Sequence, residues 1–233
     1  GSEFIYDGLL SWYNARLTPS SGLVPEVCEI GEAFTDTYSG YPDLQLKSPS
    51  LVIESRINGI RTPAYHGGVV SPVTGYVLFG SGGNGGIRLS QANASIDGFT
   101  VDANSGGLTG CYLVGFGTSA TKINLKNVNY RGFFLFGPGA RASRCLAKNC
   151  TSGFFLTSFA IGLKIDNSVA VGCTKGFDND GSTSYASIYN NISVGNTTNW
   201  ITSSLSTNLL YSNASNNAGL SGEAWMTSGA TRI

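Results

Sequence analysis

The feature that most constrains the fold of this chain is a short motif, a glycine followed by an apolar residue, that recurs from residue 86 onward. The motif occurs at Gly86-Ile87, Gly107-Leu108, Gly132-Phe133, Gly153-Phe154 and Gly176-Phe177, and Asn199-Trp200 occupies the next position. The steps between successive motifs are 21, 25, 21, 23 and 23 residues. This period is too short for a propeller blade or a helical hairpin repeat, and the leucine-rich repeat consensus is absent. The repeat therefore predicts a solenoid of short coils.

The segments between the motifs have the composition and alternation of β-strands. Residues 95–101 alternate between polar and apolar side chains, which is typical of a strand with one buried face. A second strand is predicted in four repeats, at Ile123-Asn124-Leu125, Arg144-Cys145-Leu146, Leu163-Lys164-Ile165 and Ile188-Tyr189-Asn190. Stacked coils let each strand pair with its equivalent in the next coil, about 4.8 Å away. We therefore predict an all-β fold, a right-handed single-stranded parallel β-helix.

Glycine and asparagine are expected at the corners of the coils. A corner requires positive φ, which glycine adopts freely and asparagine tolerates better than most residues. Asn127, Asn167 and either Asn190 or Asn191 fall at similar places in their coils. Stacked asparagines satisfy one another's amides, so we expect a structural role for them.

The N-terminal region is predicted to close one end of the solenoid. Residues 1–4 are typical of a cloning remnant and are left out of the fold prediction. Residues 5–22 are expected to form a short capping α-helix, with Asp7 as its N-cap and Pro19 as its stop. Residues 23–233 are expected to form the β-helix, with early strands near 27–30, 51–54 and 76–79. The C-terminal end has no obvious cap, which is expected of a chain cut from a longer protein.

Composition excludes several classes of function. Charged residues make up 12% of the chain, the formal net charge is +0 and the pI is about 6.8, which argues against a nucleic-acid partner. No apolar run approaches the roughly 18 residues of a membrane span. Five cysteines without CxxC spacing predict neither a zinc site nor a disulfide framework. We expect free thiols in the core and no metal or cofactor.

An aromatic column follows the repeat. Phe133, Phe154, Phe177 and Trp200, one in each coil, are expected to stack inside the solenoid. Strand alternation then turns Phe134 and Phe155 outward. Exposed phenylalanines need a partner, which would be a second copy of the chain or an extended ligand.

Asp178 and Asp180 are the candidates for catalysis. Residues two apart on a strand face the same way, which places the two carboxylates about 6–7 Å apart. Such a pair suits an inverting glycosidase, in which a water molecule lies between the two carboxyl groups. The same residues would also suit a Ca²⁺ site or a solvated turn.

Other polar features offer weaker signals. Arg131, Arg141, Arg144 and Lys148 form a mildly basic group that would meet acidic sugars or lie in solvent. His66, the single histidine, is expected to be an ordinary loop residue. The glycine-rich stretch 80–86 lacks the lysine and Ser/Thr of a Walker motif and is expected to form a corner between coils.

The coils of residues 87–210, with their rhythm of N-x-x-(V/A) followed by G-F, resemble the parallel β-helix proteins of the pectate-lyase-like superfamily. Their irregular glycine-rich coils are most similar to phage tailspikes, tail fibres and capsid-decoration proteins. The Gly-His-Gly and Arg-x-Lys motifs of pectate lyases and polygalacturonases do not occur here. The resemblance thus implies the architecture and a phage-type role, and the missing motifs argue against classical pectinolytic activity.

Three functions are compatible with these observations. The first is a non-enzymatic virion protein, expected to be a homotrimer, that displays a binding surface to other virion proteins or to a cell-surface polysaccharide. The second is a tailspike depolymerase that acts through Asp178 and Asp180. The third is a secreted or surface-bound bacterial adhesin. The expected binding or subunit-interface residues are Arg131, Phe134, Phe155 and Asp178.

Overall fold

The structure is a computed structural model of the 233-residue chain. It describes residues 27–31, 35–39, 43–44, 52–57, 60–61, 69–73, 85–106, 109–157, 161–180, 186–202, 209–211 and 213–215. Side chains are described within 87–102, 109–157, 161–179 and 186–201, and for Asn213 and Ser215. The predicted capping helix, the strand predicted near 76–79, and His66 lie outside these residues.

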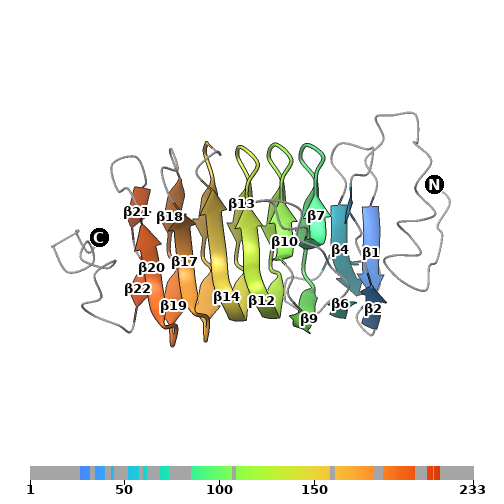
Figure 1. The fold of residues 1–233 in the computed structure, drawn as a ribbon. Coiled ribbons are helices and arrows are strands. Elements are labelled where there is room, and N and C mark those ends of the chain that lie inside the picture. Colours follow the sequence, from blue (N-terminus) through green and yellow to red (C-terminus); the bar gives the residue numbers. More distant parts are fainter. Residues whose placement is uncertain are drawn as a thin grey trace.

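The described residues form an all-β parallel solenoid, as the repeat predicts (Figure 1). Each complete coil contributes strands to three sides, which we name face A, face B and face C. In chain order a coil runs from face C through a loop to face A, and then around two corners to faces B and C. No helix occurs in the described part of the chain, so none there is able to cross a membrane.

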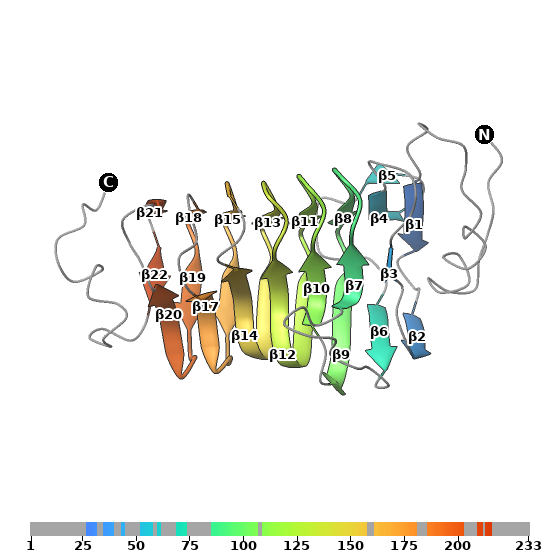
Figure 2. The same cartoon turned by 45° about the horizontal axis from the view of Figure 1, so that its top comes forward.

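Face A is one stack of strands, which Figure 2 shows in line. Its strands are β1 (Val27–Gly31), β4 (Val52–Ile57), β8 (Ser95–Asp97), β11 (Ser119–Thr121), β13 (Arg141–Ser143), β15 (Lys164–Asp166), β18 (Ser187–Tyr189) and β21 (Leu209–Tyr211). Strand β5 (Ile60–Arg61) adds an antiparallel pairing to β4. The strands predicted near 27–30 and 51–54 are confirmed as β1 and β4.

Faces B and C belong to a second sheet. Face B contains β2 (Thr35–Ser39), β6 (Val69–Val73), β9 (Thr100–Gly106), the first parts of β12 (Asn124–Leu135) and β14 (Leu146–Thr157), β16 (Val169–Val171), β19 (Ile192–Val194) and β22 (Ala214–Ser215). Face C contains β3 (Asp43–Leu44), β7 (Gly85–Leu89), β10 (Thr109–Leu113), the last parts of β12 and β14, β17 (Lys175–Asp180) and β20 (Thr198–Thr202). The pairing of β12 with β14 shifts register between Val128 and Arg131, where both strands pass from face B to face C.

The register of face C confirms most of the repeat and corrects its second position. Ile87 pairs with Cys111 and Cys111 with Phe133, so Gly110-Cys111 is the second motif of the series. The prediction of Gly107-Leu108 was wrong by three residues. The reason is the length of β9, which runs to Gly106 and makes this coil longer than the next. A cysteine at the apolar position also hides the pattern.

The predicted second strand is wrong in register, because it mixes two faces. Asn124 pairs with Leu146, and Leu146 with Val169, on face B. Lys164 instead pairs with Arg141 on face A. The two three-residue strands of a coil are separated by a two-residue corner, so a small error in alignment moves a segment from one face to the other.

The aromatic column lies inside the solenoid, as predicted. Phe133, Phe154, Phe177 and Trp200 are in successive register and at most 2% exposed. The ring centroids are 4.9, 4.8 and 4.3 Å apart, and the interplanar angles are 8°, 6° and 11°. The rings therefore stack at the spacing of the strands that carry them.

Two corners of the coil use the left-handed backbone region, as expected. The corner between faces A and B holds Gly98, Lys122, Arg144, Asn167 and Asn190, all with positive φ. The corner between faces B and C holds Asn127, Asn149, Gly172 and Gly195. Asn167 and Asn190 thus share a place, whereas the prediction that Asn127 shares it is wrong. Lysine and arginine at such positions were not anticipated.

The second residue of the corner between faces A and B points inward, and these residues form a polar ladder along the axis. The Cys145 amide donates to Ser168 Oγ at 3.0 Å, and the Ser168 amide donates to Asn191 Oδ1 at 2.8 Å. The Asn191 amide in turn donates to Asn213 Oδ1 at 3.0 Å. Each of these side chains satisfies a buried backbone group of the preceding coil, which confirms the expected structural role of stacked asparagines.

Four cysteines have described side chains, and all four are free thiols in the core, as expected: Cys111, Cys145, Cys150 and Cys173. Burial raises the pKa of Cys145 to about 12. Such a thiol is a poor nucleophile at neutral pH, so its role is to fill space. No group of three or more described His, Cys, Asp or Glu side chains is placed to hold a metal ion.

Candidate functional site

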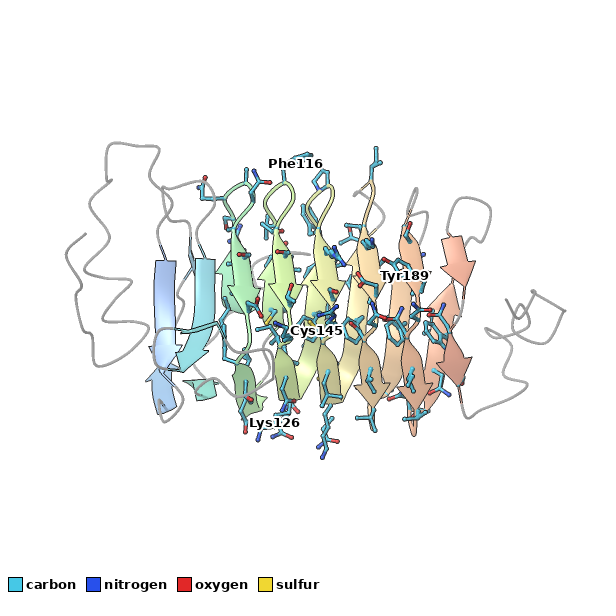
Figure 3. All side chains as sticks on the ribbon, turned by 180° about the vertical axis from the view of Figure 1, so that it is seen from behind. Phe116, Lys126, Cys145 and Tyr189 are labelled. Atoms are coloured by element: carbon cyan, nitrogen blue, oxygen red, sulfur yellow. The ribbon has the colours of Figure 1, made fainter. Side chains whose placement is uncertain are left out.

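Face A presents two rows of polar side chains to the outside. The strands of face A from β8 to β18 have three residues each, and the middle side chain is buried, for example Ile96, Ala142 and Ile188. The first and third residues of each strand therefore point outward. The row of first residues is Ser95, Ser119, Arg141, Lys164 and Ser187. The row of third residues is Asp97, Thr121, Ser143, Asp166 and Tyr189. Figure 3 shows Tyr189 on this face.

A depression of about 420 Å³ lies on this surface. It is lined by Ser119, Thr121, Arg141, Ser143, Arg144, Asp166, Asn167 and Tyr189. Six of these residues come from β11, β13, β15 and β18, and the other two from the corner that follows face A. The lining thus combines hydroxyl groups, an amide, two guanidinium groups, a carboxylate and one aromatic ring.

Asp166 is the centre of the hydrogen-bond network in the depression. Its Oδ1 accepts from Arg141 Nε at 2.9 Å, and its Oδ2 accepts from Arg141 Nη2 at 3.0 Å. Oδ2 also accepts from Ser143 Oγ at 2.8 Å and from Asn167 Nδ2 at 2.9 Å. Burial acts to raise the pKa of Asp166, but these hydrogen bonds outweigh it and lower the pKa below its ordinary value. Asp166 is therefore an ionised anchor and a poor general acid.

The Arg141 guanidinium is hydrogen-bonded along one edge, and its other edge faces the surface. Nε and Nη2 bind Asp166, and Nη2 also donates to Ser143 Oγ at 3.3 Å. Nη1 donates to no described residue. The Arg141 side chain is 44% exposed, against 3% for Asp166. The geometry thus fixes the guanidinium and leaves a cationic donor at the surface.

Further cations surround the depression. Lys164 lies over the Tyr189 ring at 4.9 Å from its centroid. Arg144 is exposed at the corner, and Lys122 Nζ lies 3.7 Å from Asp97. Four cations and two described carboxylates therefore occupy the outer side and first corner of face A from β8 to β18. This region is positive although the chain as a whole is neutral.

Phe134 and Phe155 lie outside the core, on face C, as alternation predicts. Their expected exposure is wrong, because they are only 2% and 6% exposed. They form a second apolar cluster with Tyr112, whose ring stacks on Phe134 at 4.5 Å. The Arg131 guanidinium covers this cluster, 3.8 Å from the Phe155 ring centroid and 4.5 Å from that of Phe134. The cluster therefore packs within one chain.

Asp178 extends the same outer row of face C, because it pairs with Phe155. It is 2% exposed, and its Oδ2 accepts from Ser152 Oγ at 2.9 Å and from Lys175 Nζ at 3.0 Å. Asp180 ends β17, and its side chain is not among those described. The catalytic pairing of these two aspartates stays a prediction.

The basic group predicted from the sequence is divided between faces. Arg141 and Arg144 line the depression, Arg131 packs on face C, and Lys148 is exposed on face B. The sequence predicted that these arginines would meet acidic sugars or lie in solvent, and it did not predict Ser143, Asn167 or Tyr189 as site residues. The signal for Ser143 and Tyr189 is a polar residue at both ends of each three-residue strand of face A, and it is recognised only in the correct register.

Comparisons with known proteins add the following. No protein-family model matches the chain, and no curated protein matches it. One similar solved structure is a pectin methylesterase in complex with a hexasaccharide, at 12% identity and a TM-score of 0.47, over 97% of this chain and 92% of that one. Another is the pectate lyase Pel9A, at 15% identity and a TM-score of 0.31, over 91% of this chain and 72% of that one.

Proposed function

We propose that this chain is a rigid, non-enzymatic β-solenoid that binds a polysaccharide on face A. The observation that carries the proposal is the depression lined by hydroxyl, amide, guanidinium, carboxylate and aromatic groups. Sugars offer hydroxyl groups that hydrogen-bond to such side chains, and apolar C–H faces that pack on an aromatic ring. Tyr189, a half-buried residue beside Lys164, supplies that ring.

The ion pairs of the described aspartates favour binding over catalysis. Asp97 pairs with Lys122 and Asp102 with Lys126, at 3.7 and 3.2 Å. Asp166 pairs with Arg141 and Asp178 with Lys175, at 2.9 and 3.0 Å. A general acid in glycoside hydrolysis needs a raised pKa, whereas a cation beside a carboxylate favours its ionised form. Asp166, the carboxylate of the depression, has a lowered pKa, which is the opposite of what such an acid needs.

Binding to bacterial surface polysaccharides tests the proposal. We expect at least one polysaccharide of a panel to slow the migration of the wild-type chain in affinity electrophoresis. The double variant Tyr189→Ala/Arg144→Ala should weaken that binding about tenfold or more, because it removes the ring and one cation from the lining. Lys148→Ala, an exposed change on face B, should bind like the wild type. Binding unaffected by the double variant, or no binding to any polymer, would contradict the proposal.

The depolymerase alternative is distinguished by the products formed from the same polymers. The non-enzymatic proposal expects no release of reducing ends or unsaturated sugars. Release that is abolished by Asp178→Asn or Asp180→Asn would establish the enzyme instead and assign those residues.

We also propose that the chain is part of a phage virion, as a homotrimeric spike or decoration. The alternative is a bacterial cell-surface adhesin. The support is the rigid parallel solenoid together with its resemblance to phage fibres. The proposed subunit interface remains Arg131, Phe134, Phe155 and Asp178, on the outer side of face C. Light scattering at micromolar concentration tests this assembly, and a monomer contradicts it.

A further inference from the structure

We propose that Cys150 and Cys173 form an oxidation site, at which a peroxide converts the two thiols into a disulfide that joins two consecutive coils and stabilises them. This inference goes beyond the polysaccharide-binding function proposed above and does not depend on it. Three features of the pair support it: the register of the two residues, the contact between their thiols, and their place beside a corner of the coil.

Cys150 and Cys173 occupy the same place in consecutive coils, directly after the positive-φ residue of the corner between faces B and C. Two residues earlier, on face B, Lys148 pairs with Val171. The Thr174 amide donates to Cys150 O at 3.0 Å, which keeps the two coils in register at the cysteines. Paired strands lie about 4.8 Å apart, and the Cα atoms of a disulfide lie about 4.4–6.8 Å apart. The backbone therefore holds the two residues at a spacing that a disulfide can span.

The two thiols lie beside each other in the core. Cys150 is 4% exposed and Cys173 is 3% exposed, and a hydrogen bond joins the two thiols. This bond lowers the pKa of Cys173 and, together with burial, raises the pKa of Cys150. Cys173 is thus the thiol that ionises more readily, and the thiolate is the form that reacts with oxidants. Cys145 differs, because Ser168 occupies its place in the next coil.

The corner provides both access and room for closure. Asn149 and Gly172, which directly precede the two cysteines, are exposed, so each thiol lies one residue from solvent. The Cβ atoms of a disulfide are about 3.5–4.5 Å apart, slightly closer than paired strands, so closure requires a small shift. Cys173 lies between β16 and β17, and its amide donates to a side-chain atom, Asn196 Oδ1, at 2.7 Å. The shift therefore breaks no strand pairing.

The reaction consumes one peroxide and releases water. The Cys173 thiolate attacks a peroxide oxygen, the O–O bond breaks and hydroxide leaves, which gives a sulfenic acid. The Cys150 sulfur then attacks the sulfenic sulfur, the S–O bond breaks and a second hydroxide leaves. The protons of the two thiols convert both hydroxides into water. Each sulfur loses one electron, and the peroxide gains both.

Peptide mapping of the oxidised chain tests the site. The folded chain is treated with hydrogen peroxide, its remaining thiols are alkylated, and it is digested with trypsin without a reductant. Cleavage after Lys148, Lys164 and Lys175 separates the two cysteines into peptides 149–164 and 165–175. We expect mass spectrometry to find these peptides joined, and to find them separate after reduction. The oxidised chain should also melt about 5 °C or more above the reduced chain.

Serine variants assign the crosslink to this pair. Cys150→Ser and Cys173→Ser should each abolish it, together with the rise in melting temperature. Cys145→Ser, which changes another buried thiol beside a corner, should retain both. Separate, alkylated peptides from the oxidised wild type would overturn the proposal, as would a crosslink from either cysteine to a different one. A crosslink without a higher melting temperature would overturn its stabilising role. The wild-type map decides the case even where a serine variant does not fold.

Discussion

Replacing Phe154 by alanine is expected to lower the free energy of unfolding by about 3–5 kcal/mol. Phe154 is 0% exposed and stacks between Phe133 and Phe177, with centroid distances of 4.9 and 4.8 Å. The truncation removes both ring contacts and leaves a cavity in a wall of paired strands that has little freedom to collapse. Equilibrium denaturation by urea, followed by circular dichroism, measures the loss.

Phe116→Ala is the matched control, because the same side chain is lost from a site that is 65% exposed (Figure 3). Its effect should stay within about 0.5 kcal/mol. A Phe154→Ala variant as stable as Phe116→Ala would mean that the ring stack does not hold the coils together.

Gly137→Ala is expected to lower the free energy of unfolding by about 3 kcal/mol. A methyl group at this position would overlap the backbone carbonyl oxygens of Gly115 and Val114 in the preceding coil. No side-chain rotation relieves this contact, so neighbouring coils would have to separate. The Gly137 amide donates to Leu113 O at 2.9 Å, and that bond would be strained as well. Thermal and urea unfolding measure the effect.

Gly139→Ala, two residues further on, isolates the cost of backbone conformation. Gly139 has a φ of 71°, but a methyl group there would lie no closer than 3.7 Å to a neighbouring atom. We expect a loss of about 1–2 kcal/mol from the left-handed backbone alone. If Gly139→Ala lowered the free energy of unfolding more than Gly137→Ala did, the close stacking of the loops between faces C and A would be refuted.

The fold was predictable because a solenoid repeats its physical constraints in every coil. The ring column at Phe133, Phe154, Phe177 and Trp200 follows directly from one motif and its period. The register of individual coils was harder to predict from the sequence. The coil with Cys111 lacks an aromatic at the motif position, and the corners at Lys122 and Arg144 adopt positive φ without glycine or asparagine. Local propensity does not reveal such positions, since stacking against neighbouring coils imposes them.

The candidate site was predictable only in part. Arg141 and Arg144 stand out in a chain with few charges, and both line the depression. Asp166 is one of several aspartates with no partner at a local spacing, so it was not predicted as a site residue; its partners Arg141 and Ser143 are 25 and 23 residues away. Asp178 is a different case, and its catalytic role stays a prediction. Its Asp-Asn-Asp sequence suggested chemistry, but the side chain is buried against Ser152 and Lys175. Burial and long-range pairing decide such cases, and local sequence contains neither.

The ladder that runs from Cys145 through Ser168 and Asn191 to Asn213 gives the solenoid a chemical direction. In each step the backbone amide of one coil is satisfied by a side chain of the following coil. The coils are therefore not interchangeable modules. Transposing two of them, or excising one, would set an unmatched side chain against an amide that needs an acceptor. Changes in solenoid length would then be tolerated only where the joined coils restore this donor-to-acceptor order, so the ladder restricts how such a chain can be lengthened or shortened.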